Sequence, residues 1–144
     1  MNATGSVLLD TTVVVDHLRG KNPSIAQRLK GIGTLYLPLT ALGELLYGAY
    51  NSVFQAKGIK QVEDFLRICA VLAPDEHTAH IYGRIKTELS RKGKPIPQND
   101  VWIAAVALEH NLPLAGLTDQ EFSDSWKNVH GFIGNRLSNR FVFS

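Results

Sequence analysis

The sequence predicts an α/β protein, and two observations lead to that class. Short apolar runs, each closed by a turn residue, recur along the chain, and helical patterns with apolar residues three or four apart separate them. Strands that alternate with helices favour parallel β-α units. We therefore expect a three-layer α/β/α sandwich around a mainly parallel central sheet of four or five strands.

The bulk composition agrees with a single domain over residues 1–144. Of these 144 residues, 44% are apolar, which is enough to bury a sizeable core. The formal net charge of +2 is mildly basic and does not by itself indicate a nucleic-acid partner.

The cysteine count and the first residues of the chain indicate the compartment. Cys69 is the only cysteine, so no intramolecular disulfide can form, and a reducing compartment fits best. Residues 1–6 lack the basic start and the long apolar stretch of a signal peptide. The apolar runs are far shorter than the roughly 20 residues that a membrane span needs. We expect a soluble cytoplasmic protein with no membrane partner.

The first element is a short buried strand at the apolar run Val7–Leu9. Asp10 follows it directly, and the hydroxyl of Thr11 or Thr12 can cap a helix through Val13–Leu18. A carboxylate at the carboxyl end of a parallel strand, beside the start of a helix, lies where open α/β sheets build their sites.

The residues of the first expected helix favour a strand as well as a helix. Val13, Val14 and Val15 are β-branched, and such residues prefer strands. A first strand that continues through Val15 is therefore an alternative. It would place Asp10 in the middle of a strand, away from the edge at which parallel sheets build sites.

The remaining elements follow from apolar spacing and from the residues that end each pattern. The expected strands are Thr34–Leu37, Ala70–Leu72, Leu112–Ala115 and Phe141–Phe143. The expected helices run from Ser24 to Gly31 or Gly33, from the cap Thr40 to Tyr50, from Gly58 to Cys69, from Asp75 or Thr78 to Gly93, and from the cap Asn99 to Asn111.

Four carboxylates fall at comparable places in this pattern. Asp10 and Asp119 follow strands, while Glu44 and Asp100 lie in the expected first turns of helices. In a parallel sheet these are all carboxyl-edge positions, so one cleft can gather all four. Carboxylates that close repel one another, and a divalent cation removes the conflict. Oxygen-only ligation favours Mg²⁺ or Mn²⁺, which can activate water and stabilise charge on a phosphate.

A simpler interpretation stays open beside the metal site. An acid in the first turn of a helix often only complements the helix dipole or caps the helix. Glu44 and Asp100, taken singly, fit that structural role. The metal site depends on all four acids sharing one edge of the predicted sheet.

Four segments of the sequence form a set in a fixed order. They are Leu8–Asp16, Thr40–Ala49, Pro97–Ala107, and Asn111–Leu114 leading to Thr118–Phe122. Each is a weak motif alone, but together they resemble the PIN domain family, and within it the VapC-like toxins of bacterial toxin–antitoxin pairs. The likeness spans most of the chain.

The resemblance implies an endoribonuclease, the toxin of such a pair, that hydrolyses RNA phosphodiesters with water activated by Mg²⁺ or Mn²⁺. The family's acids carry over onto Asp10, Glu44, Asp100 and Asp119. The three aspartates would hold one or two ions, and Glu44 would bind metal or orient the attacking water. These four are the expected catalytic and metal-binding residues.

Two threonines are expected to support the acids. The family's polar residue after the first acid, usually Asn or Ser, carries over onto Thr12, which can still donate a hydrogen bond. The last segment departs from the family pattern. Leu117 stands where the family often has Thr or Ser, and Thr118 is expected to supply the missing hydroxyl.

The resemblance also implies the partners, which are an RNA substrate, a cognate antitoxin and a second copy of the chain in a homodimer. A basic stretch before the third acid could contact RNA phosphates, or could simply be a solvated helix face. Its members are Arg84, Lys86, Arg91, Lys92 and Lys94. An apolar group in the helix expected from Thr40 to Tyr50 could be core or dimer face. It consists of Leu45, Leu46, Tyr47 and Tyr50.

Other functions compete with the endoribonuclease. A non-catalytic PIN-like module could bind RNA or protein with the acids only capping helices, and the presence of all four acids argues against it. A metal-dependent phosphatase or deoxyribonuclease could use the same ligands, because fold and metal do not fix the substrate.

Overall fold

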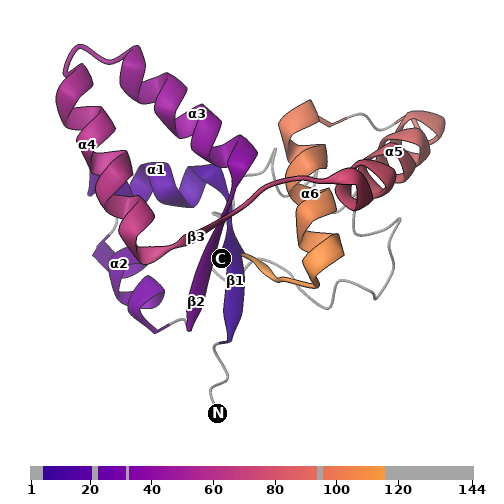
Figure 1. Ribbon diagram of the computed structural model, residues 1–144, viewed down its shortest axis with the longest axis horizontal. Coiled ribbons are helices and arrows are strands. Elements are labelled where there is room, and N and C mark those ends of the chain that lie inside the picture. Colours follow the sequence, from indigo (N-terminus) through magenta and orange to yellow (C-terminus); the bar gives the residue numbers. More distant parts are fainter. Residues whose placement is uncertain (1–4, 21–22, 32, 94–95, 116–144) are drawn as a thin grey trace.

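The structure is a computed structural model that describes residues 5–20, 23–31, 33–93 and 96–115. Four parallel strands form one sheet: β1 (Ser6–Leu9), β2 (Thr34–Pro38), β3 (Ala70–Leu72) and β4 (Leu114–Ala115). The helices are α1 (Thr11–Arg19), α2 (Pro23–Lys30), α3 (Leu39–Tyr50), α4 (Gln55–Phe65), α5 (Glu76–Arg91) and α6 (Gln98–His110), with a 3-10 turn η1 (Leu66–Ile68) after α4. Figure 1 shows α1 to α4 on one side of the sheet and α5 with α6 on the other. The predicted α/β/α sandwich is confirmed.

The strand order β3-β2-β1-β4 places the first strand inside the sheet. The connections from β1 to β2 and from β2 to β3 run through α1 to α4, and the connection from β3 to β4 returns through α5 and α6 on the opposite face. The direction of winding therefore reverses at β1. Open α/β sheets bind their ligands outside the carboxyl ends of the strands at such a reversal.

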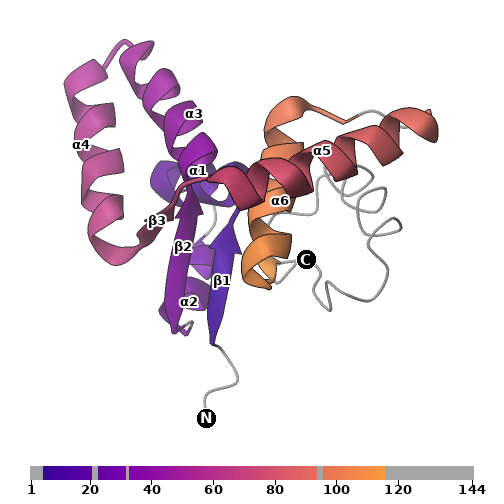
Figure 2. The ribbon, with the colours of Figure 1, turned by 45° about the vertical axis from the view of Figure 1, so that its right-hand side comes forward.

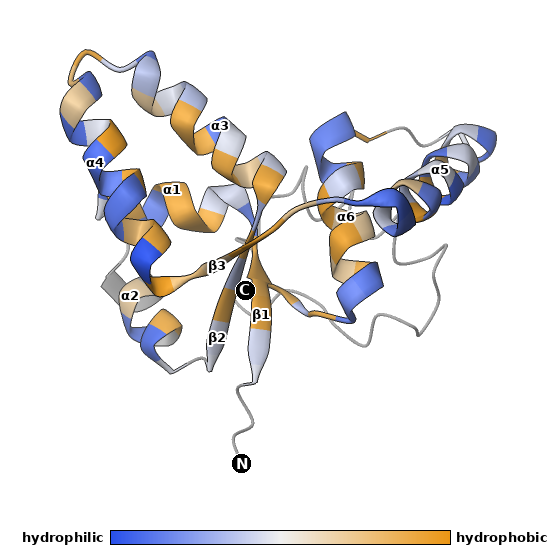
Figure 3. Cartoon of the chain, in the orientation of Figure 1, coloured by the Kyte–Doolittle hydropathy of each residue, from blue (hydrophilic) through white to orange (hydrophobic). Residues whose placement is uncertain are grey.

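Alternate side chains of β1 enter two separate cores. Val7 and Leu9 pack with the helices α1 to α4, whereas Leu8 packs with α5 and α6. All three side chains are buried, as the central place of the strand requires. Figure 3 shows the apolar residues on the strands and on the inner parts of α3 and α6, and Figure 2 shows α5 lying across α6.

The first helix begins immediately after β1, so the alternative of a longer strand is wrong. α1 begins at Thr11, and its N-cap is Asp10 rather than Thr11 or Thr12 as expected. Val13 and Val14 are fully buried in the core of the α1–α4 side. Packing of an amphipathic face therefore outweighs the weak strand preference of these valines.

Two predicted caps are wrong for one physical reason. α3 begins at Leu39 with Pro38 as its N-cap, and α6 begins at Gln98 with Pro97 as its N-cap; Thr40 and Asn99 lie one residue inside their helices. A proline has no N–H to satisfy, and its fixed φ suits the residue before a helix. Glu44 consequently lies in the second turn of α3 and not in the first.

Other boundaries follow the sequence closely. Asp75 is the N-cap of α5 and forms a capping box with Thr78, and Asn111 ends α6 in the left-handed conformation. The helix expected from Gly58 to Cys69 begins earlier, at Gln55, and its last part is the turn η1. The strand expected at Phe141–Phe143 lies outside the described residues. Every helix in the described ranges is too short or too polar to cross a lipid bilayer.

Candidate active site

Asp10 lies at the carboxyl end of β1, where the winding of the sheet reverses. Its backbone N–H donates to the carbonyl oxygen of Ala115 at 2.9 Å, which ties the residue to β4. The residue is only 2% exposed although it carries a carboxylate. A buried acid needs partners, because removing its charge from water costs free energy.

Burial raises the pKa of the Asp10 carboxyl above its usual value, and the charge of Glu44 adds to the rise. The hydroxyl of Thr12 donates to Oδ2 of Asp10 and, together with the backbone N–H groups of Thr11 and Thr12, opposes the rise. Within the described ranges, no lysine or arginine forms an ion pair with Asp10. Thr12 thus lies where the sequence prediction places it, beside the first acid.

Glu44 approaches the same place from α3. Its Oε1 accepts a hydrogen bond from the hydroxyl of Thr11 at 3.1 Å. Glu44 itself is exposed, so its carboxylate faces solvent beside the buried Asp10. The structure therefore brings together two of the predicted acids and adds Thr11, a residue that the sequence analysis did not assign to the site.

Asp100 lies in the first turn of α6, as predicted, and is half-buried. Figure 1 shows that α6 begins on the side of the sheet where the strands end, and α6 contacts α3. Asp119 and Thr118 lie outside the described residues. Among the residues that the structure does describe, no three His, Cys, Asp or Glu side chains form a group that could hold a metal ion.

The donors at this edge fit a hard divalent cation. They are carboxylate oxygens, which suit Mg²⁺ or Mn²⁺ better than softer metals. Asp10 is buried beside a second carboxylate, and its pKa is raised in the absence of a cation. A bound ion would remove both the desolvation penalty and the repulsion by Glu44.

An open groove of about 620 Å³ lies between α1, α3 and α4, and Glu44 is one of its lining residues. Apolar side chains make up much of the wall, with Val15 and Leu45 among them. Arg19 and Lys57 add positive charge to the same groove. A chain segment with apolar and acidic side chains would complement this lining.

The basic residues of α5 point in more than one direction. Arg84 and Arg91 line a shallow groove of about 480 Å³, and Arg91 also pairs with Glu88 at 3.3 Å. Lys86 instead donates to the hydroxyl of Tyr82 at 3.1 Å. Lys92 follows the helix as its C-cap, and Lys94 lies outside the described residues. RNA contact by this stretch stays a prediction.

The apolar group of α3 divides between the core and the surface. Leu45 is buried and Leu46 packs against the same core. Tyr47 and Tyr50 are 72% and 58% exposed. The alternative that the whole group is core is therefore wrong, since only the leucines are.

A parallel sheet wound on both faces, with acids at the carboxyl end of its first strand, defines a class of α/β proteins that build their sites at that edge. The sequence model of the PIN domain family matches residues 7–125. The chain belongs to the PIN domain family, and the resemblance stated from the sequence is confirmed.

Among its relatives is the protein named Ribonuclease VapC2 of Haemophilus influenzae (strain KW20 / Rd), with 35% identity over 117 residues, or 80% of this chain and 88% of the relative. The protein named tRNA(fMet)-specific endonuclease VapC of Shigella flexneri is 29% identical over 116 residues, with the same coverage. The chain is also similar to a chain in the crystal structure of VapBC2 from Rickettsia felis, which is bound to a DNA fragment from the VapBC2 promoter. It has a TM-score of 0.76 and 26% identity over 81% of this chain and 90% of that chain.

Proposed function

We propose that this protein is a VapC-type endoribonuclease, the toxin of a toxin–antitoxin pair, which hydrolyses RNA phosphodiesters with the help of Mg²⁺ or Mn²⁺. The observation that carries the proposal is the buried carboxylate of Asp10 beside Glu44 at the end of the central strand. The 35% identity to a protein named Ribonuclease VapC2 supports the choice of RNA as substrate.

Asp10, Asp100 and Asp119 would hold the ion or ions, with Glu44 beside them. A bound Mg²⁺ or Mn²⁺ lowers the pKa of a water ligand and stabilises negative charge on a phosphate. The chain's own part is to fix the carboxylates in place: Thr12 holds one oxygen of Asp10, and Thr11 holds one oxygen of Glu44. The exposed carboxylate of Glu44 is placed to accept a hydrogen bond from a water or an RNA hydroxyl.

The proposed protein partner is a cognate antitoxin. The likeness to the VapBC2 structure supports it. The groove between α1, α3 and α4 offers an apolar wall with Arg19 and Lys57 for such a partner, and it reaches Glu44. An antitoxin segment there would block access to the site. The homodimer stays an expectation that rests on the resemblance.

Cleavage of a structured RNA by the purified chain tests the enzymatic part. We expect cleavage in Mn²⁺ or Mg²⁺ that stops with EDTA and returns when the metal is restored. Asp10→Asn should lower the rate by at least about 10²-fold, because it removes a charged oxygen ligand from the site. Asp64→Asn is the matched control, since Asp64 is exposed and pairs with Lys60 at 3.0 Å on α4.

Three results would contradict the proposal in different ways. Equal cleavage with and without EDTA would remove the metal from the mechanism. Equal rates for Asp10→Asn and Asp64→Asn would remove Asp10 from the site. Binding of RNA without cleavage under all metal conditions would favour the non-catalytic module.

A further inference from the structure

Two adjacent threonines begin α1, and each engages a different acid. Thr12 donates to Asp10, as the sequence predicts. Thr11 donates to Glu44 on α3, a residue 33 positions away in the chain, at 3.1 Å. The second bond joins two helices that are separate in sequence and that pack on the same face of the sheet.

Conformational entropy and repulsion by Asp10 both act against the position of the Glu44 carboxylate. Its side chain is exposed and has rotatable bonds whose ordering costs conformational entropy. The charge of Glu44 also acts unfavourably on Asp10, so the two carboxylates repel one another. A hydrogen bond from a fixed donor opposes both tendencies, and bonds to charged acceptors are the stronger kind.

Thr11 is well placed to be that fixed donor. It is the first residue of α1 and directly follows Asp10, so its backbone is held by the end of β1. A β-branched side chain in a helix has few χ1 rotamers, so its hydroxyl direction is restricted. The carbonyl four residues earlier belongs to Val7 in β1 and not to a helical turn, which leaves the hydroxyl available for Glu44.

We infer that Thr11 is a positioning residue that holds the Glu44 carboxylate beside Asp10 and thereby strengthens divalent-cation binding at this edge of the sheet. The inference rests on the proposed function for the presence of the cation. It differs from the role expected of Thr12, because Thr11 acts on the acid of another helix. Asp10 and Glu44 are thus held by neighbouring hydroxyls of one helix turn.

The test compares Thr11→Val with Thr11→Ser in the full chain. Valine keeps the shape of threonine and removes the donor, whereas serine keeps the donor. Mn²⁺ affinity, measured by isothermal titration calorimetry at one fixed pH, should fall about tenfold in Thr11→Val and stay within about twofold of the wild type in Thr11→Ser. Thr87→Val is the matched control, because the Thr87 hydroxyl bonds to the Gly83 carbonyl oxygen within α5.

A second arm repeats Thr11→Val in a Glu44→Gln background. If Thr11 acts through the Glu44 carboxylate, the valine substitution should change Mn²⁺ affinity far less there than in the wild type. Thermal unfolding without metal checks that every variant is folded. Wild-type Mn²⁺ affinity in folded Thr11→Val would overturn the inference, as would equal losses in Thr11→Val and Thr11→Ser or an undiminished loss in the Glu44→Gln background.

The outcomes also separate this inference from the proposed function. A wild-type chain that binds Mn²⁺ but leaves RNA intact contradicts the endoribonuclease, while the affinity series still decides the role of Thr11. A wild-type chain that binds no Mn²⁺ overturns both. RNA cleavage with normal Mn²⁺ affinity in Thr11→Val overturns only the role of Thr11.

Discussion

The starts of α1 and α5 use the same three residue types in different ways. Each helix has an aspartate as its N-cap, Asp10 or Asp75. Each has a threonine in its first turn whose hydroxyl donates to a glutamate of another helix: Thr11 to Glu44, and Thr78 to Glu109. What differs is the partner of the aspartate carboxylate.

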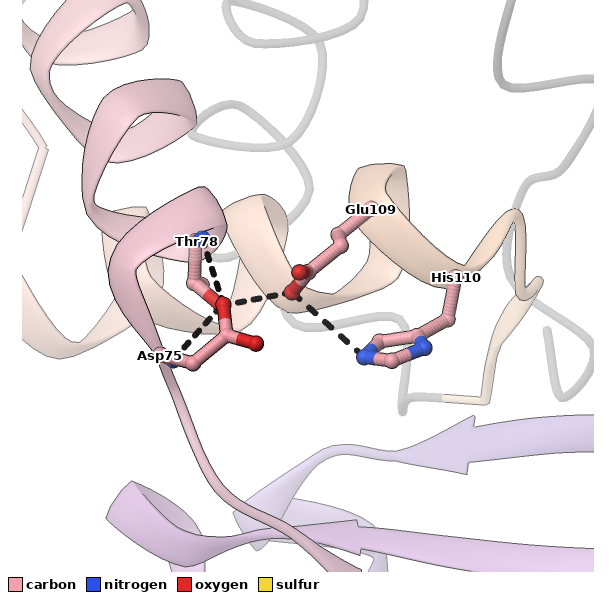
Figure 4. Close-up of polar contacts among 4 residues, drawn as sticks. All are labelled: Asp75, Thr78, Glu109 and His110. Carbon is pink, nitrogen blue, oxygen red and sulfur yellow. Dashed lines mark hydrogen bonds and ion pairs between the residues drawn. The ribbon is translucent and has the colours of Figure 1, made fainter.

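At the start of α5, the helix backbone donates a hydrogen bond to the carboxylate of Asp75. Oδ1 of Asp75 accepts from the backbone N–H of Thr78 at 3.1 Å, and the backbone N–H of Asp75 donates back to the Thr78 hydroxyl oxygen at 2.9 Å. That backbone hydrogen bond from Thr78 lowers the pKa of Asp75. Figure 4 shows Glu109 and His110 of α6 beside the same cluster. The Thr78 hydroxyl donates to Oε1 of Glu109 at 2.5 Å, and that oxygen lies 3.4 Å from Nε2 of His110.

The α1 start leaves its acid without such a cap. The Thr12 hydroxyl and the backbone N–H groups of Thr11 and Thr12 lower the pKa of Asp10, but burial outweighs them and raises it overall. The comparison teaches that an aspartate at a helix start has a structural role when hydrogen bonds from the helix stabilise its charge and lower its pKa. It is a candidate ligand when its burial outweighs the hydrogen bonds to its charge, so that its pKa is raised.

The largest stability effect that this comparison predicts is at Thr78. Thr78→Val should lower the free energy of unfolding by about 2 kcal/mol, because the fully buried hydroxyl serves both the capping box and Glu109. Thr11→Val, at a half-buried hydroxyl beside an exposed glutamate, should cost less than about 0.5 kcal/mol. Urea unfolding of both variants measures this difference, and equal losses in the free energy of unfolding would contradict it.

A smaller effect of opposite sign is expected at Asp10. In EDTA at pH 7, Asp10→Asn should raise the free energy of unfolding by about 1 kcal/mol, since it removes a buried charge. A raised native pKa means that the native state binds the proton more tightly than the unfolded chain. Stability therefore falls as pH rises from the unfolded value of about 3.8 through the native pKa.

The control for this prediction is the pH dependence of the increase in the free energy of unfolding. The advantage of Asp10→Asn should vanish below about pH 3.8, where Asp10 is protonated in both states. Urea unfolding at a series of pH values measures it. A variant less stable than the wild type at pH 7 without metal would show that the ionised carboxylate stabilises the fold.

The smallest effect is expected at Asp75, and its pH dependence should run the other way. A lowered native pKa contributes stability that is present above the unfolded value of 3.8 and is lost as pH falls through the native pKa. Asparagine caps helices nearly as well as aspartate. Asp75→Asn should therefore be slightly less stable than the wild type at pH 7, and the difference should shrink below pH 3.8 in thermal unfolding.

Local signals in the sequence predict the fold better than they predict the site. The apolar run Val7–Leu9 predicts β1, and Asp75 is one of the two helix starts that the sequence offers for α5; the structure confirms the strand and selects Asp75 as the N-cap. The sequence pattern places the start of α3 too late, because Pro38 both ends the strand and caps the helix. A sequence pattern does not reveal such a shared boundary.

The site depends on distances between elements, which the sequence does not contain. Asp10 could be placed from its position after a strand. The bond from Thr11 to Glu44 could not be foreseen, because it depends on how α1 packs against α3. A polar side chain directly after the first acid was the available signal, and either threonine fitted it. Asp119, which lies outside the described residues, remains a prediction from the sequence.

The four residues of β1 have a consequence for how the protein melts. Because Val7 and Leu9 belong to one core and Leu8 to the other, neither half can open without exposing the strand that both share. The backbone N–H groups of Leu8 and Asp10 both bond to the β4 side, at 2.9 Å each. We therefore expect the amide hydrogens of Leu8 and Asp10 to exchange with solvent only when the whole domain unfolds, which would place the backbone beneath Asp10 in the slowest-exchanging unit of the molecule.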